Sequence, residues 1–198
     1  MNDQKPLRER KQLQARERIV RAANELFRER GFEAVSVTDI ADRAEVGRTS
    51  FFRYFGDKQE VVFAHEQALV DAIGALHRQN SLPVPTTLAE AIAQLREIVV
   101  ALCIQVTADP EEYRWHYALI DGHADLQARD ALKQQRLARL LAEILVSRGA
   151  GTPMATLASQ AALACFMTAR YASGQDARTL VAATEAAFDE LLRLGSRG

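Results

Sequence analysis

Alanine and proline together constrain the fold of this chain more than any other feature of its sequence. The 198 residues include 34 alanines but only 5 prolines, and no proline lies between Pro6 and Pro83. Alanine is the strongest helix former among the amino acids and proline is the weakest. Apolar residues also recur at spacings of three and four, which is typical of amphipathic helices. The sequence therefore predicts an all-α protein.

The composition excludes several classes of protein. Hydrophobic residues make up 48% and charged residues 26%, which is the usage of a globular domain rather than of a disordered chain. No apolar run is long enough for a transmembrane helix, and the polar residues 1–21 lack the apolar core of a signal peptide. We therefore expect a cytoplasmic protein without a membrane partner.

The sequence predicts neither a metal site nor catalytic residues. Cys103 and Cys165 are too few for a disulfide framework or a four-cysteine zinc site. His65 and His77 lack acidic or thiol neighbours at ligand spacing, and Gly122 is expected to interrupt the helix that His116 and His123 would share. No Ser–His–Asp or Cys–His arrangement and no phosphate-binding loop stands out. We expect no metal, no cofactor and no enzymatic activity, with a small helical enzyme as an alternative.

Capping signals divide the chain into about nine helices. Residues 36–39 and 57–60 have the pattern of capping boxes, in which a side chain at the helix start and one three residues later bind each other's backbone amides. Residues 1–11 are expected to fray, and Pro83 and Pro85 mark a linker. The expected helices are 12–30, 37–44, 48–55, 57–79, 87–108, 110–122, 125–148, 153–173 and 175–194.

Residues 36–55 have the layout of a helix-turn-helix. A short helix, a turn at 45–47 and a second short helix follow one another. Phe51 and Phe55, four residues apart, predict the buried side of the second helix. In a helix-turn-helix this second helix enters the major groove of DNA, which is wide enough for one helix. The alternative is a plain three-helix core whose charged side chains form a solvated face.

Side chains that suit DNA lie on and around the second short helix. Arg48, Thr49 and Ser50 begin it, and arginine can donate to a guanine edge while threonine can meet a thymine methyl. Donors near the ends of the unit are predicted to hold phosphates: Ser36, Thr38, Tyr54 and Lys58. Residues 1–60 carry 13 basic and 11 acidic side chains, a bias that a solvated helix face explains about as well. Sequence-independent DNA compaction is another alternative, but it needs far more positive charge.

The order of residues from Gly31 to Lys58 resembles the DNA-binding signature of the TetR (tetracycline-repressor-like) family of transcriptional regulators. The resemblance covers residues 12–62 in detail, and its clearest segments are Gly31-Phe32, Ser36-Val37-Thr38-Asp39-Ile40-Ala41 and Ala44-Glu45-Val46-Gly47-Arg48-Thr49-Ser50-Phe51-Phe52-Arg53-Tyr54-Phe55-Gly56-Asp57-Lys58. It implies base contacts for Arg48, Thr49 and Ser50 and phosphate contacts for the four donors named above.

The resemblance also implies an architecture and a mechanism. Residues 1–58 are expected to form the DNA-binding domain and residues 59–198 a ligand-binding and dimerisation domain. The family pattern is a homodimer, most commonly a repressor, that reads a palindromic operator of double-stranded DNA through the helix at 48–55. A small molecule, which the sequence does not identify, is expected to release the DNA by moving the helix predicted at 57–79.

Three residues depart from the family pattern. Glu45 stands where the turn commonly has glycine, so a positive φ there is less favourable. Gly47 stands where a small hydroxyl residue often precedes the second short helix. Phe52 stands where tyrosine often supplies a phosphate-binding hydroxyl, so we do not expect that contact.

The last two predicted helices carry small and apolar residues at helical spacing, which suits self-association as a four-helix bundle. From the spacing alone, filling the core of one monomer is an equal alternative, and the resemblance favours the dimer. The predicted interface consists of Ala161, Cys165, Thr168, Ala172, Val181, Thr184, Phe188 and Leu191.

A ligand pocket is expected to be mostly apolar with a few polar groups. Trp115 and His116 are the most suggestive pair, although Trp115 can instead fill the core and His116 can lie at the surface. Arg170 can bind an acidic ligand or pair with a carboxylate. The candidates are Phe63, Leu102, Cys103, Gln105, Trp115, His116, Leu119, Phe166 and Arg170.

Overall fold

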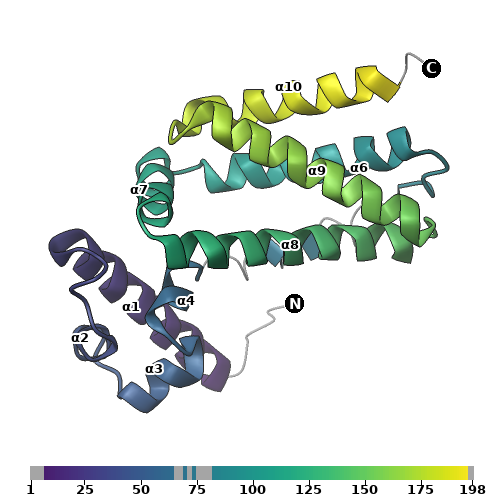
Figure 1. The fold of residues 1–198 in the computed structure, drawn as a ribbon. Coiled ribbons are helices and arrows are strands. Elements are labelled where there is room, and N and C mark those ends of the chain that lie inside the picture. Colours follow the sequence, from purple (N-terminus) through teal and green to yellow (C-terminus); the bar gives the residue numbers. More distant parts are fainter. Residues whose placement is uncertain (1–6, 65–68, 71–72, 75–81, 196–198) are drawn as a thin grey trace. The chain divides into compact units, whose positions relative to one another are not determined.

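The computed structural model describes residues 7–64, 69–70, 73–74 and 82–195. Within these residues the chain has nine helices and no strand, so the predicted all-α fold is confirmed. The chain folds into two compact units, Met1–Gln67 and Ala68–Gly198 (Figure 1). The first unit extends past residue 58, where the sequence places a boundary, because the helix that follows packs against the helices before it.

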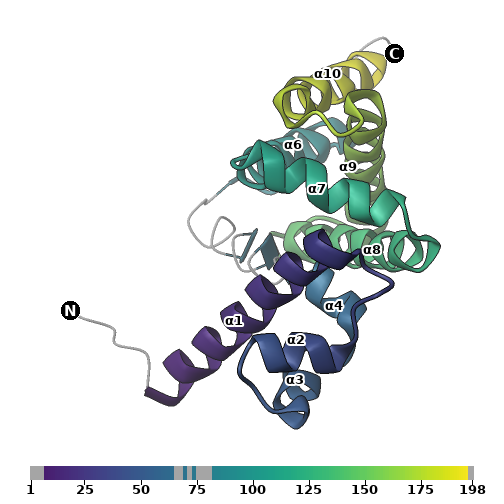
Figure 2. The ribbon, with the colours of Figure 1, turned by 90° about the vertical axis from the view of Figure 1, so that its left-hand side faces the viewer.

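The first unit contains four helices. In chain order they are α1 (Leu7–Arg30), α2 (Val37–Arg43), α3 (Arg48–Phe55) and α4 (Lys58–Val62). The long helix α1 packs against α2 and α4, and α3 packs against α2 and α4 (Figure 2). Helical spacing turns one apolar side of each helix inward, as the sequence predicts. The buried side chains include Ile19, Ala23, Leu26, Phe27, Ile40, Ala41, Phe51 and Phe55.

Two predicted helix limits in the first unit are wrong. Helix α1 begins at Leu7 instead of residue 12, because arginine, lysine, glutamine and glutamate are good helix formers even without burial. The helix predicted for 57–79 ends at Val62, where the Phe63 and Ala64 amides donate to carbonyls three residues back and close the last turn. Of the range 65–79 the structure describes residues 69–70 and 73–74, which are helical, and the other residues lie outside the described part of the chain.

The second unit contains α6 (Leu88–Val106), α7 (Pro110–Asp121), α8 (Ala124–Ser147), α9 (Thr152–Ser173) and α10 (Ala177–Gly195). Helix α9 packs against α10, α8 and α6, while α7 packs mainly on α8 (Figure 1). Local signals set the helix starts. Thr87 and Glu90 form a capping box, and Asp109 caps α7 with Pro110 at its first position.

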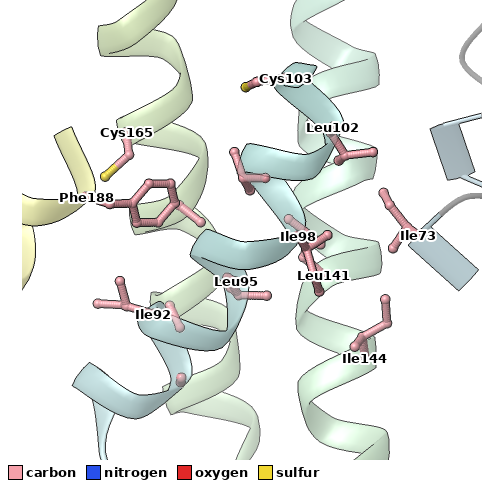
Figure 3. Close-up of a cluster of buried hydrophobic side chains, with 14 of the residues drawn as sticks. Ile73, Ile92, Leu95, Ile98, Leu102, Cys103, Leu141, Ile144, Cys165 and Phe188 are labelled. Atoms are coloured by element: carbon pink, nitrogen blue, oxygen red, sulfur yellow. The ribbon is translucent and has the colours of Figure 1, made fainter. Parts of the chain in front are cut away.

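One apolar core holds these helices together. In Figure 3, α6 lies in the middle, with Leu141 and Ile144 of α8 on one side and Cys165 and Phe188 on the other. Each fully buried leucine, isoleucine or phenylalanine contributes about 1.5–3 kcal/mol by removing apolar surface from water. Among the described residues no single helix is long and apolar enough to cross a membrane; α6 and α7 pass that test of length and composition only as a pair bent by 99°.

Candidate nucleic-acid interface

A tight turn at residues 44–47 joins α2 to α3. The Glu45 amide donates to the Asp42 carbonyl at 3.1 Å, and the Val46 amide donates to the Ala41 carbonyl at 3.0 Å. Glu45 has φ 54°, the only positive φ of a non-glycine residue in the described part of the chain. This left-handed conformation costs such a residue about 1–2 kcal/mol. The turn therefore keeps the geometry that glycine favours, although the sequence supplies glutamate.

Helix α3 has a buried side that anchors it to the unit. Gly47 is its N-cap, and the Gly47 carbonyl accepts hydrogen bonds from the Ser50 amide at 2.8 Å and the Phe51 amide at 3.1 Å. Phe51 is fully buried, and Phe55 is 7% exposed. The predicted inward side of this helix is confirmed. With two rings buried in the unit, α3 is held in one orientation and its other side is left to solvent.

The exposed side of α3 carries cationic, polar and aromatic groups. Arg48, Thr49 and Arg53 are exposed. Ser50 is half-buried, and its hydroxyl accepts a hydrogen bond from the Arg53 guanidinium at 3.4 Å. Phe52 lies between the two arginines in the sequence and is 45% exposed. Two of the three predicted base readers are therefore exposed to solvent, together with an aromatic ring that the sequence did not single out for this role.

At the start of α2, one predicted phosphate-binding hydroxyl is engaged within the chain. The Ser36 hydroxyl donates to the Asp39 carboxylate and accepts from the Asp39 amide at 3.2 Å, while the Ser36 amide donates to Asp39 Oδ2 at 2.8 Å. These bonds confirm the predicted capping box and hold the pKa of Asp39 below its ordinary value. Thr38, the second residue of α2, is exposed.

Lys58 has a structural role that the sequence did not predict. Its ammonium donates to the carbonyls of Phe32 at 2.9 Å and Val35 at 3.1 Å, and it lies 4.3 Å from the centre of the Phe32 ring. An ammonium has three N–H donors, so two of them serve the segment between α1 and α2. Tyr54 is half-buried, and the Arg53 guanidinium lies 5.1 Å from its ring centre.

Ion pairs fasten α2 to α1. The Arg43 guanidinium lies 3.3 Å from Glu25 and 3.1 Å from Glu29, and Arg30 lies 3.6 Å from Asp39. The hydrogen bond from Arg43 lowers the pKa of Glu29 and raises that of Arg43. Exposed pairs of this kind add little stability, but they place the acidic residues of α1 against α2.

The predicted pocket residues do not all lie in one unit. Phe63 is buried in the first unit, directly after α4, whereas the others lie on α6, α7 and α9 of the second. In the second unit Leu102 and Cys103 are buried and Gln105 is exposed. The remaining side chains are half-buried: Trp115, His116, Leu119, Phe166 and Arg170.

Arg170 pairs with carboxylates, the alternative that its sequence position left open. Its guanidinium lies 2.7 Å from Asp130 and 2.9 Å from Asp121, with its central carbon 4.2 Å from the centre of the Tyr117 ring. The side chains of Arg170 and Asp130 are 14% and 16% exposed. Two carboxylates thus already balance the Arg170 charge, which weakens the case for an acidic ligand there.

Two polar groups near Cys103 were missed by sequence reasoning. The Cys103 sulfur lies 3.5 Å from the hydroxyl of the buried Thr184. Tyr113 is buried, and its hydroxyl has no hydrogen-bond partner among the described residues. Burial raises the pKa of Tyr113 to about 12. The four-residue spacing of Tyr113 and Tyr117, whose ring centres are 4.7 Å apart, was the available sequence signal.

The predicted dimer residues separate into two groups. Cys165, Thr184 and Phe188 are buried in the second unit itself, as expected if these helices fill the core of one chain. These three side chains therefore face the interior of one chain, and a contact of theirs with a second copy stays a prediction. The other predicted residues are exposed or half-buried: Ala161, Thr168, Ala172, Val181 and Leu191.

Comparison with known proteins connects this site to a family. Residues 19–64, which include α2, the turn and α3, match the family described as "Bacterial regulatory proteins, tetR family". The regulator TcmR of Streptomyces glaucescens is 39% identical over 66 residues, which are 33% of this chain and 29% of TcmR. The chain thus matches less than a third of that relative's length. FasR of Mycolicibacterium smegmatis, a transcriptional activator, is 28% identical over 151 residues, 67% of each protein.

The likeness extends over the fold. FadR of Thermus thermophilus, described as a TetR-family transcriptional repressor and solved in complex with lauroyl-CoA, superposes with a TM-score of 0.58 at 25% identity. That match covers 92% of this chain and 95% of FadR. The family consists of transcriptional regulators rather than enzymes. Residues 19–64 thus match the TetR family of transcriptional regulators, and the all-helical architecture of the chain is similar to that of a TetR-family regulator.

Proposed function

We propose that this chain regulates transcription by reading a specific DNA sequence through α3. The observation that carries the proposal is the exposed side of that helix, where Arg48 and Thr49 extend from a segment anchored by Phe51 and Phe55. Arginine and threonine suit base edges, and an eight-residue helix fits the major groove. We also propose the cytoplasm as its place of action, because bacterial chromosomal DNA lies there.

Phosphate contacts on both sides of α3 would orient it in the groove. Thr38 is exposed at the start of α2, and Tyr54 lies at the far end of α3. Two N–H groups of the Lys58 ammonium donate to carbonyls, so the third can donate to a phosphate. The Ser36 hydroxyl already donates to Asp39, so a phosphate would have to compete with that carboxylate. Contacts of this kind position a protein on DNA without reading its sequence.

The regulator is proposed to act as a homodimer on a palindromic operator. Along the outer side of α9, the exposed Leu157 and Tyr171 flank the small residues Ala161, Thr168 and Ala172. Tyr171 is 91% exposed. Apolar surface of this kind suits a second copy, since small residues allow close helix approach. Two copies related by a two-fold axis would meet half-sites about one helical turn of DNA apart.

A small molecule bound in the second unit is proposed to relieve repression. The likeness to Thermus FadR supports acyl-CoA, with lauroyl-CoA as the first compound to test. An apolar interior such as that of α6–α10 suits an acyl chain, and Leu102, Cys103, Trp115, His116, Leu119 and Phe166 are retained as candidate contacts. Any such ligand acts only through its different affinities for the DNA-bound and free conformations.

Selection from a random duplex library, followed by binding titration at near-physiological salt, tests DNA recognition. The folded protein should enrich one palindromic sequence. Arg48→Ala should weaken binding to it by about 1–3 kcal/mol and relax the preference at one base pair per half-site. Arg178→Ala, an exposed arginine of the second unit, is the matched control and should bind as the wild type does. If folded protein enriches no sequence, the proposal is wrong.

The ligand is tested on the selected duplex. Lauroyl-CoA should weaken DNA binding in a saturable manner, whereas free coenzyme A should not. Equal effects of the two compounds would rule out recognition of an acyl chain, and no effect of either would exclude lauroyl-CoA as the effector.

A further inference from the structure

Phe52 is an exposed aromatic side chain on α3. Among the described residues of the first unit, Leu13 and Phe52 are the large apolar side chains that remain exposed. The Phe52 ring is in edge contact with the buried Phe51 ring, with centres 5.8 Å apart and planes at 86°. A contact with a fully buried neighbour restrains the exposed ring, while 45% of Phe52 still faces solvent. Water contact with an aromatic ring is unfavourable, so a partner would stabilise it.

The place of Phe52 on α3 indicates what that partner is. Phe52 follows Arg48 by four residues and Thr49 by three, and side chains at these spacings share one side of a helix. A single ring beside Arg48 and Arg53 is much smaller than the apolar patches that bind proteins. In the major groove, the apolar group on a base edge is the 5-methyl of thymine, and phenylalanine is among the side chains that contact it.

We propose that Phe52 reads a thymine methyl in each half-site and so determines part of the sequence specificity. This inference rests on the proposed DNA recognition by α3. The side chain of phenylalanine has no hydrogen-bonding group, so the contact is purely apolar. One helical turn rises 5.4 Å and successive bases are about 3.4 Å apart. The thymine should therefore lie roughly one or two base pairs from the base that Arg48 contacts.

The test replaces each thymine of the selected duplex, one at a time, by deoxyuridine. This substitution removes the 5-methyl and leaves the base-pairing groups unchanged. With the wild-type protein, replacement at one position per half-site should weaken binding about fourfold, as expected for losing the burial of one methyl group. With Phe52→Ala, the same replacement should have no effect. Phe52→Tyr, which keeps the ring, should remain sensitive.

Arg48→Ala is the matched control, because it weakens binding through another side chain and should keep the deoxyuridine effect. If Phe52→Ala retains the fourfold loss, or if no thymine position is sensitive in the wild type, the proposal for Phe52 is wrong while DNA recognition stands. If folded wild-type protein selects no sequence at all, both proposals fail. The midpoint temperature of thermal unfolding should be close to the wild-type value for Phe52→Ala. Such a result shows that the binding defect of this variant does not come from misfolding.

Discussion

The two units of this chain pair their polar groups over different distances in the sequence. In the helix-turn-helix, Ser36 and Asp39 bind each other across three residues, and Arg43 reaches Glu29 across 14. In the second unit, Arg170 reaches Asp130 across 40 residues and Cys103 reaches Thr184 across 81. The segment from α2 to α3 is therefore shaped largely by its neighbours in the sequence, although the first unit also has longer contacts: Lys58 reaches Phe32 across 26 residues and Arg16 reaches Ala64 across 48. The second unit depends more on which helices pack together.

This difference also fits the functions proposed for the two units. A DNA reader needs one helix held rigidly with its outer side open, which Phe51 and the turn at 44–47 achieve within a short segment. A unit that responds to a ligand needs an interior that can accept other arrangements. The buried Tyr113 hydroxyl without a described partner is the kind of unsatisfied group that a bound molecule or a water can use.

The largest expected effect separates the stabilities of the units. Phe51→Ala removes a fully buried ring from the small core of the first unit and should destabilise it by about 3–5 kcal/mol. Phe52→Ala, the neighbouring and exposed phenylalanine, should change stability by less than about 0.5 kcal/mol. Denaturant unfolding followed by far-UV circular dichroism, with limited proteolysis to identify the unfolded region, measures both. Equal losses for the two variants would show that Phe51 is not a core residue.

A smaller effect is expected in the second unit. Arg170→Met leaves Asp130 and Asp121 without their cation and should destabilise this unit by about 3 kcal/mol, the low end for breaking a buried pair, because both partners keep some exposure. The first unit should keep its stability. The control Arg178→Met breaks an exposed pair with Asp176 and should cost less than about 1 kcal/mol. Urea-induced unfolding of both variants measures these losses of stability. If Arg170→Met loses as little stability as the control, Arg170 does not form the buried ion pair described above.

The smallest effect concerns Tyr113 and depends on pH. Its pKa in the folded chain, about 12, exceeds the ordinary value of 10, so folding favours the neutral phenol. The stability linked to this phenol is complete below pH 10 and is lost as the pH rises through about 12. Tyr113→Phe should add about 1 kcal/mol at neutral pH by removing a buried unpaired hydroxyl, and it should reduce the alkaline loss. The exposed Tyr171→Phe is the control, and unfolding curves on both sides of this window are the measurement.

Much of α3 was predictable because the residues that determine it are close together in the sequence. Helix propensity, the Ser36 cap and the four-residue spacing of Phe51 and Phe55 act within one or two turns, so they can be recognised in the sequence. The exposure of Arg48 and Thr49 follows from the same spacing. The left-handed Glu45 shows the limit of this reasoning, since the packing of α2 against α3 holds a conformation that its residue type disfavours.

The sequence by itself determined the helical class, most helix starts and the two sides of α3. Only the tertiary structure decided the partners of Lys58 and Arg170, the end of α4 at Val62 and the burial of Phe188. The spacing of apolar residues predicts which side of a helix is apolar. It does not predict whether another helix of the same chain or another molecule covers that side. Likewise, a lysine or arginine side chain can pair with any carboxylate or carbonyl that the fold brings near. Which group is near depends on contacts between residues far apart in the sequence.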